Sequence, residues 1–189
     1  MLEEAGLDYE KAPVELGRPE RGADFLAASP MGKVPALEDG EVRMWDSAAI
    51  CMYLADRYAP GRLAPAADSP DRGLYLQWMF FTPGAIEPAA AEKEAGRLSV
   101  PRVNGWGNFE KTIETWERGL TGRAWIVGDR FTAADVMLGS CAIGMRADGT
   151  LPESPALEAY ADRCMAREPY RRALAAEGPA EAGGVPGRA

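Results

Sequence analysis

The sequence predicts a small α/β domain followed by an all-helical domain. Two short β-type runs within residues 34–45 are joined by a tight turn, and a helical run follows them. Residues 59–70 are rich in Pro, Gly and Ala, which is typical of a linker between domains. Beyond this linker the strong patterns all have helical spacing. We therefore expect an α/β domain over residues 1–58, a helical domain over 71–176 and a flexible tail over 177–189.

The α/β prediction depends on a proline that precedes a strand. Proline cannot donate a hydrogen bond to a sheet, so Pro35 is expected at the first residue of a strand. An X-Pro bond can be cis at a cost of only about 0.5–1 kcal/mol, and a cis bond would turn the backbone of Val34 outward. Its N–H and C=O groups could then pair with an extended peptide. Asp39-Gly40 predicts the hairpin turn.

A helix start follows the hairpin. Ser47 stands directly before a good helical run, residues 48–54, and is expected to be its N-cap. The free N–H groups at such a helix end, together with the partly positive helix dipole, suit a bound carboxylate. The plainer alternative is an ordinary packing unit with a capped helix and no ligand.

The helical domain has two clear landmarks. Apolar residues recur at intervals of three and four from Trp106 to Leu120, which predicts one buried helix face. Thr132 and Asp135 have the spacing of a capping box at the start of another helix. A further helix is expected near residues 156–167, closed by Pro169.

Two more helix signals flank these landmarks. Ser69 and Pro70 predict a helix start, and Thr82-Pro83-Gly84 predicts a kink in that helix. At the beginning of the chain, residues 2–6 predict the last turn of a helix capped by Gly6. Residues 9–15 then predict a strand, with Pro13 indicating an edge position.

Composition excludes several function classes. The net charge of −8 argues against nucleic acid or an anionic membrane as the main partner. The chain has no histidine, which excludes Ser-His-Asp, Cys-His and His-based metal chemistry. Its three cysteines are widely spaced, which favours reduced thiols in a cytoplasmic protein over a disulfide framework or a metal site. No apolar run approaches the ~20 residues that span a bilayer.

Val34-Pro35, Asp46-Ser47 and the capping box in residues 128–138 together resemble the glutathione S-transferase family, with details after the linker closest to bacterial members. The resemblance implies a thioredoxin-like first domain whose first strand and first helix start, roughly 15–20 residues, are lacking here. It also implies that Val34, beside cis Pro35, binds the cysteinyl backbone of glutathione. By the same resemblance Ser47 binds the γ-glutamyl carboxylate, Asp46 binds the ammonium group, and Lys33 helps near the glycyl end.

For activity, the resemblance implies conjugation of the glutathione thiolate to an electrophilic apolar compound by a cytoplasmic homodimer, with no metal. Reduction, dehalogenation and isomerisation are related possibilities on this scaffold. No residue matches the family's thiol-activating Ser, Tyr or Cys, so no catalytic residue is assigned. A non-catalytic glutathione-binding or assembly module is therefore the alternative.

Other side chains near the site have competing interpretations. Cys51 is expected to be a small buried apolar group, not a catalytic thiol. Four residues could contact the electrophile but are more simply explained as core: Tyr75, Trp78, Met79 and Phe81.

Overall fold

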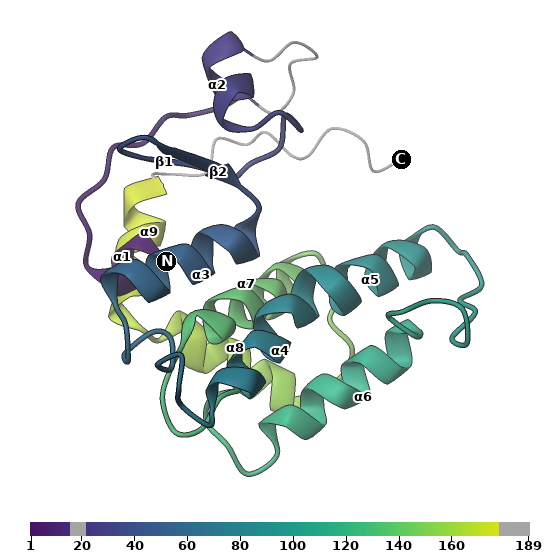
Figure 1. Ribbon diagram of the computed structural model, residues 1–189. Coiled ribbons are helices and arrows are strands. Elements are labelled where there is room, and N and C mark those ends of the chain that lie inside the picture. Colours follow the sequence, from purple (N-terminus) through teal and green to yellow (C-terminus); the bar gives the residue numbers. More distant parts are fainter. Residues whose placement is uncertain (16–21, 178–189) are drawn as a thin grey trace.

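The computed structural model of the chain describes residues 1–15 and 22–177. Figure 1 shows a β-hairpin and a short helix on one side of helix α3, and a bundle of helices on the other side. The α/β and all-helical organisation predicted from the sequence is confirmed. The elements are α1 (Leu2–Ala5), α2 (Ala23–Ala28), β1 (Ala36–Asp39), β2 (Val42–Trp45), α3 (Ser47–Tyr58), α4 (Arg72–Phe81), η1 (Thr82–Ile86), α5 (Glu87–Glu94), α6 (Phe109–Leu120), α7 (Ala133–Ala147), α8 (Pro155–Met165) and α9 (Glu168–Glu177).

The predicted hairpin is present. β1 and β2 pair antiparallel, from Ala36 opposite Trp45 to Asp39 opposite Val42. Gly40 begins the turn with φ 61°, a backbone conformation that glycine adopts without strain. The hairpin is fixed to α3 because the Asp39 carboxylate accepts hydrogen bonds from two tyrosine hydroxyls of that helix, Tyr53 at 2.7 Å and Tyr58 at 2.6 Å.

The strand predicted over residues 9–15 is wrong. Residues 7–15 form no ladder, and the sheet of the described chain contains only β1 and β2. A strand needs a neighbour to satisfy its backbone groups, and no described strand lies beside this segment. Tyr9 instead donates its hydroxyl to a carboxylate oxygen of Glu3, at 3.1 Å.

The predicted helical turn at the start of the chain is confirmed. α1 contains four residues and ends at Gly6, whose φ is 72°. A helix this short does not form on its own, because the conformational entropy lost in nucleation outweighs the hydrogen bonds of a single turn. Here the turn contacts α3 and α9 and is held by arginine side chains from other parts of the chain. Arg62 donates to the carbonyl oxygens of Glu4 and Ala5, and Arg172 pairs with Glu3.

The first helix of the bundle begins later than predicted. Its N-cap is Asp71, while Ser69 and Pro70 lie in the preceding turn, where the Ser69 hydroxyl accepts the Asp71 N–H at 3.3 Å. The Ser69 hydroxyl therefore stabilises the turn before α4 and does not cap the helix. The predicted kink at Thr82-Pro83-Gly84 is a π-helical turn, η1, that joins α4 to α5. Proline lacks the N–H that a regular α-helical ladder needs, which accounts for the irregular turn.

The bundle core contains both predicted landmarks. The apolar face of α6 is buried, with Trp116 completely enclosed. The capping box at the start of α7 is formed, and the Asp135 carboxylate also accepts hydrogen bonds from the Ile126 N–H and the Tyr160 hydroxyl, both at 2.8 Å. The acid is fully buried, and burial raises its pKa while these hydrogen bonds oppose the shift. Asp135 therefore has a structural role, as predicted.

The C-terminal prediction is partly wrong. The helix predicted near residues 156–167 is α8, and its residues Leu157, Tyr160, Ala161 and Cys164 are all buried. Pro169 does not simply close it but lies in the first turn of α9, where a missing N–H costs nothing. Glu177, expected in the tail, ends α9; residues 178–189 of that tail lie outside the described residues. None of the described helices is long and apolar enough to cross a bilayer.

Candidate functional site

The Val34-Pro35 peptide bond is cis, and β1 begins one residue after it. Val34 is exposed, and its backbone N–H and C=O make no hydrogen bond within the described part of the chain. Unpaired backbone groups in a strand-like position can pair with an added peptide strand. The site residue predicted to bind a peptide backbone therefore has both groups available.

The loop before the cis bond is braced by a serine that the sequence analysis did not single out. Ser29 is completely buried, and its hydroxyl donates to the Lys33 carbonyl at 2.7 Å and accepts the Lys33 N–H at 3.2 Å. The sequence feature that could have indicated this role is a serine four residues before Lys33, in a segment with Pro and Gly. Short hydroxyl side chains often bond the nearby backbone in turns. The Lys33 side chain itself is exposed.

The N-cap prediction for Ser47 is wrong by one residue. Asp46 is the N-cap, and its carboxylate accepts the Ala49 N–H at 2.9 Å. Asp46 has φ 82°, the one positive value among the described non-glycine residues, and Asp tolerates this conformation better than most side chains. Ser47 is the first helical residue, and its hydroxyl has no hydrogen-bond partner within residues 1–15 and 22–177. The Ser47 hydroxyl is therefore free to bind a ligand.

Three of the four apolar residues weighed for the second substrate belong to the core. Tyr75, Trp78 and Met79 are buried in the bundle, as their helical spacing favoured. Phe81 is partly buried and packs edge-to-face on Trp78, with ring centroids 5.0 Å apart. The neighbouring Phe80, which no sequence pattern singled out, is 53% exposed.

The cysteines are not activated thiols. Cys51 is buried, as predicted, and burial raises its pKa to about 11. Burial likewise raises the pKa of Cys141 and of Cys164 to about 12. A thiol with such a pKa carries almost no thiolate at neutral pH. Among the described residues, no group of three or more acidic, cysteine or histidine side chains could hold a metal ion.

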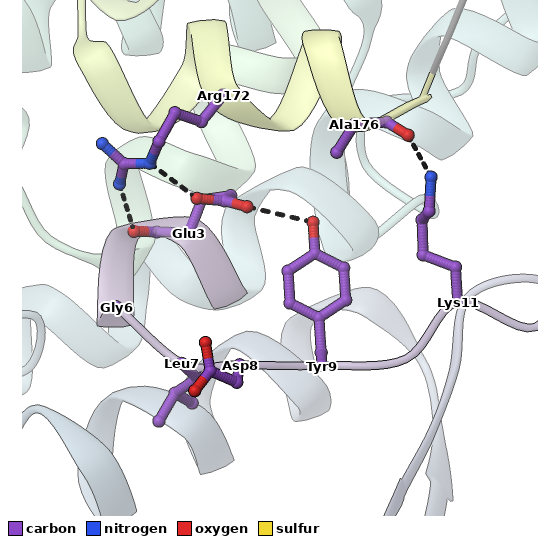
Figure 2. A pocket seen from close by; sticks show the side chains of 8 residues that line it. All are labelled: Glu3, Gly6, Leu7, Asp8, Tyr9, Lys11, Arg172 and Ala176. Carbon is purple, nitrogen blue, oxygen red and sulfur yellow. Dashed lines mark hydrogen bonds and ion pairs between the residues drawn. The ribbon is translucent and has the colours of Figure 1, made fainter.

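A pocket of about 450 Å³ lies away from all five predicted site residues. It is formed by α1, α9 and residues 6–11, and Figure 2 shows Arg172 and Tyr9 both directed at Glu3 while Lys11 reaches the carbonyl of Ala176. The polar groups at this pocket largely satisfy one another. The predicted site is instead an open surface where a loop and a helix end meet.

Two family profiles cover most of the chain. Residues 1–57 match the N-terminal domain of glutathione S-transferase, and residues 75–163 match its C-terminal domain. The chain belongs to the glutathione S-transferase family. The chain is 30% identical over 172 residues to a probable glutathione S-transferase of Oryza sativa subsp. japonica, covering 85% of this chain and 78% of the rice protein.

Solved structures agree with this assignment. A glutathione transferase from Methylococcus capsulatus superposes with a TM-score of 0.76 at 31% identity, covering 94% of this chain and 90% of that one. A sphingomonad glutathione S-transferase complexed with glutathione superposes with a TM-score of 0.75 at 32% identity, covering 95% and 92%. The chain thus folds as a thioredoxin-like domain, with two strands in its described part, followed by a helical domain.

Proposed function

We propose that this member of the family binds glutathione across the cis Val34-Pro35 loop and the start of α3, and conjugates its thiol to an electrophilic apolar compound. The observation that supports this most strongly is that two groups able to bind the peptide, the Val34 backbone and the Ser47 hydroxyl, are both available to a ligand. Among the described residues, neither the backbone N–H and C=O of Val34 nor the Ser47 hydroxyl, which lies beside the N-terminal N–H groups of α3, has a hydrogen-bond partner. The sphingomonad relative was solved with glutathione bound.

Each part of the tripeptide has a matching group. Its cysteinyl backbone would pair with the N–H and C=O of Val34, as an added strand does. Its γ-glutamyl carboxylate would accept from the Ser47 hydroxyl and from helix N–H groups that have no partner inside the helix. Asp46 would take the ammonium group, using the carboxylate oxygen that does not cap the helix. Lys33 would attract the glycyl carboxylate.

In the reaction, the thiol loses its proton, its sulfur forms a bond to the electrophilic carbon, and the leaving group departs with the electron pair of the broken bond. A free thiol has a pKa near 8.5, so acceleration requires stabilisation of the thiolate. Cys51, Cys141 and Cys164 cannot take up the glutathione proton as bases, because burial raises their pKa values and keeps their own thiols protonated at neutral pH. We assign no described residue to thiolate stabilisation.

Calorimetric titration with glutathione tests the binding step. Ser47→Ala should weaken binding by about 1–3 kcal/mol, because the ligand carboxylate would lose a hydrogen bond. Ser140→Ala is the matched control, since Ser140 is an exposed serine of α7 that bonds only its own helix. An unchanged dissociation constant for Ser47→Ala would refute the assigned role.

A conjugation assay tests the chemical step. The protein is incubated with glutathione and an activated aromatic halide, and the thioether product is identified by mass. Product formed faster than in protein-free buffer supports conjugation, whereas tight glutathione binding without product identifies a non-catalytic binding module. The homodimer and the cytoplasmic location proposed with this function are testable by light scattering and by fractionation of the source cells.

A further inference from the structure

Ser29 lies at the C-terminal end of α2, shortly before the Val34 backbone that is proposed to bind glutathione. Its side chain is completely buried, and all of its polar groups have partners. Its N–H donates to the Phe25 carbonyl at 2.7 Å, its carbonyl accepts the Gly32 N–H at 2.8 Å, and its hydroxyl bonds the backbone of Lys33. Because α2 also contacts both strands of the hairpin, Ser29 is a fixed point beside the Val34 loop.

The Ser29 hydroxyl holds Lys33 on both sides of its Cα atom. It accepts the Lys33 N–H at 3.2 Å and donates to the Lys33 carbonyl at 2.7 Å. The shorter of these two hydrogen bonds is made to the peptide group that links Lys33 to Val34. One buried side chain therefore fixes both peptide groups that flank Lys33.

The contact with the Lys33 carbonyl determines where the Val34 N–H points. A peptide group is planar, and in its trans form the C=O and the N–H point in opposite directions. The Lys33–Val34 bond is trans, since the one cis bond among the described residues is the next bond along the chain. The carbonyl points at the buried Ser29 hydroxyl, so the N–H of the same group points away from it. Within residues 1–15 and 22–177 this N–H has no hydrogen-bond partner.

The same hydrogen bond makes the Val34 N–H a stronger donor. A peptide group whose carbonyl accepts a hydrogen bond is polarised, and hydrogen bonds in a chain strengthen one another by about 10–30%. Without the Ser29 hydroxyl, the Lys33 carbonyl would lose a buried partner. Because an unpaired buried carbonyl is costly, the peptide group would rotate toward water or another donor, and the Val34 N–H would turn with it.

We propose that Ser29 is a positioning residue of the glutathione site, and that its hydroxyl directs the Val34 N–H at the cysteinyl carbonyl of the peptide. This inference rests on the proposed function. Ser29 is enclosed by the protein and acts through the Lys33–Val34 peptide group, without contact to the ligand. Its effect is limited to one of the two Val34 groups, because the Val34 carbonyl belongs to the following peptide group, which Ser29 does not bond.

Calorimetry with two ligands tests the inference. One ligand is glutathione, and the other is an analogue in which a trans alkene replaces the amide between the cysteinyl and glycyl residues. The alkene keeps the shape of the chain but lacks the carbonyl to which the Val34 N–H would donate. Ser29→Ala should weaken glutathione binding by about fivefold, the size of one neutral hydrogen bond, and should change binding of the analogue by less than about twofold.

Ser154→Ala is the matched control. Ser154 is also buried, and its hydroxyl also bonds a backbone group, the Leu157 N–H at 3.2 Å, but it caps α8 in the helical domain. This variant should lose stability and bind both ligands as the wild type does. Ser29→Cys fills a similar space with a much weaker donor, so it provides the same comparison of ligands if Ser29→Ala does not fold.

The outcomes separate this inference from the proposed function. Equal binding of glutathione by the wild type and the Ser29 variant would overturn the inference and leave the proposed function intact. Equal weakening for glutathione and the alkene analogue would also overturn it, because a site that loses both ligands alike indicates a structural role for Ser29. Failure of the wild-type protein to bind glutathione at all would overturn the proposed function together with the inference.

Discussion

The Glu4 carboxylate accepts two hydrogen bonds from the guanidinium of Arg167, each 2.7 Å long. The two residues are far apart in the sequence, and Glu4 is almost completely buried. The Arg167 guanidinium also lies over the ring of Phe131, 3.7 Å from its centroid. This pair fixes the first helical turn of the small domain to the junction of α8 and α9.

Glu4→Gln should lower the free energy of unfolding by about 2 kcal/mol, since it leaves the partly buried Arg167 without its charge partner. The measurement is urea denaturation followed by tryptophan fluorescence. Glu3→Gln is the matched control, because its partner Arg172 is more exposed and an exposed pair contributes about 0–1 kcal/mol. Equal losses of unfolding free energy in the two variants would show that burial of the Glu4–Arg167 pair adds nothing to stability.

The hairpin should detach from α3 in acid. Hydrogen bonds from Tyr58 and then Tyr53 lower the pKa of Asp39. Because the folded pKa lies below the unfolded one, the contribution of Asp39 to stability is present above its ordinary pKa, about 4, and is lost as the pH falls through the folded value. Asp39→Asn should thus be less stable than the wild type at pH 7, with a difference that shrinks below about pH 4.

The pH prediction is measured as the urea midpoint of both proteins across a pH series. Asp68→Asn provides the control, because Asp68 is exposed in the linker and forms no hydrogen bond or ion pair with the hairpin among the described residues. A stability gap between Asp39→Asn and the wild type that stays constant down to pH 2 would contradict the assignment.

The start of α7 should depend on the Thr132 hydroxyl. Thr132→Ala removes a hydroxyl that bonds the buried Asp135 carboxylate at 3.1 Å, and it should cost about 0.5–2 kcal/mol of unfolding free energy. Thr132→Ser keeps the hydroxyl and should recover most of that loss. Chemical denaturation measures both variants. A serine variant as unstable as the alanine variant would assign the effect to the methyl group instead.

The cysteines should be slow to alkylate in the native protein. With pKa values of about 11 for Cys51 and about 12 for Cys141 and Cys164, each thiol should react with iodoacetamide at pH 7 at least about a hundredfold more slowly than in urea. Mass spectrometry of timed samples gives the rate for each cysteine. Fast labelling of Cys51 in the folded protein would contradict this assignment and indicate that Cys51 is a reactive thiol.

Local signals in the sequence predicted the parts of the fold that local chemistry determines. The cis bond at Pro35, the turn at Gly40, the capping box at Thr132 and the buried face of α6 each follow from residues close together in the chain. Local signals also indicated Val34, Pro35 and Ser47 as positions that could hold a peptide ligand, whereas the roles proposed for Lys33 and Asp46 came from the family resemblance.

Features that depend on distant partners could not be predicted in this way. Asp46 replaced Ser47 as the N-cap because either side chain suits that role, and the turn that follows β2 decides between them. Residues 9–15 contain two strand-favouring residues, Tyr9 and Val14, but a strand also needs a neighbour. α9 contains Pro169 in its first turn, and a proline can stop one helix or start the next depending on where the chain has already turned.

The central claim is that glutathione lies along the backbone of Val34 with its γ-glutamyl end at the start of α3. A crystal structure of the protein grown with glutathione tests this most directly. We predict electron density for an extended tripeptide that pairs with the Val34 N–H and C=O and ends at the Ser47 hydroxyl. Density in the pocket between α1 and α9, with the Val34 surface empty, would contradict the claim.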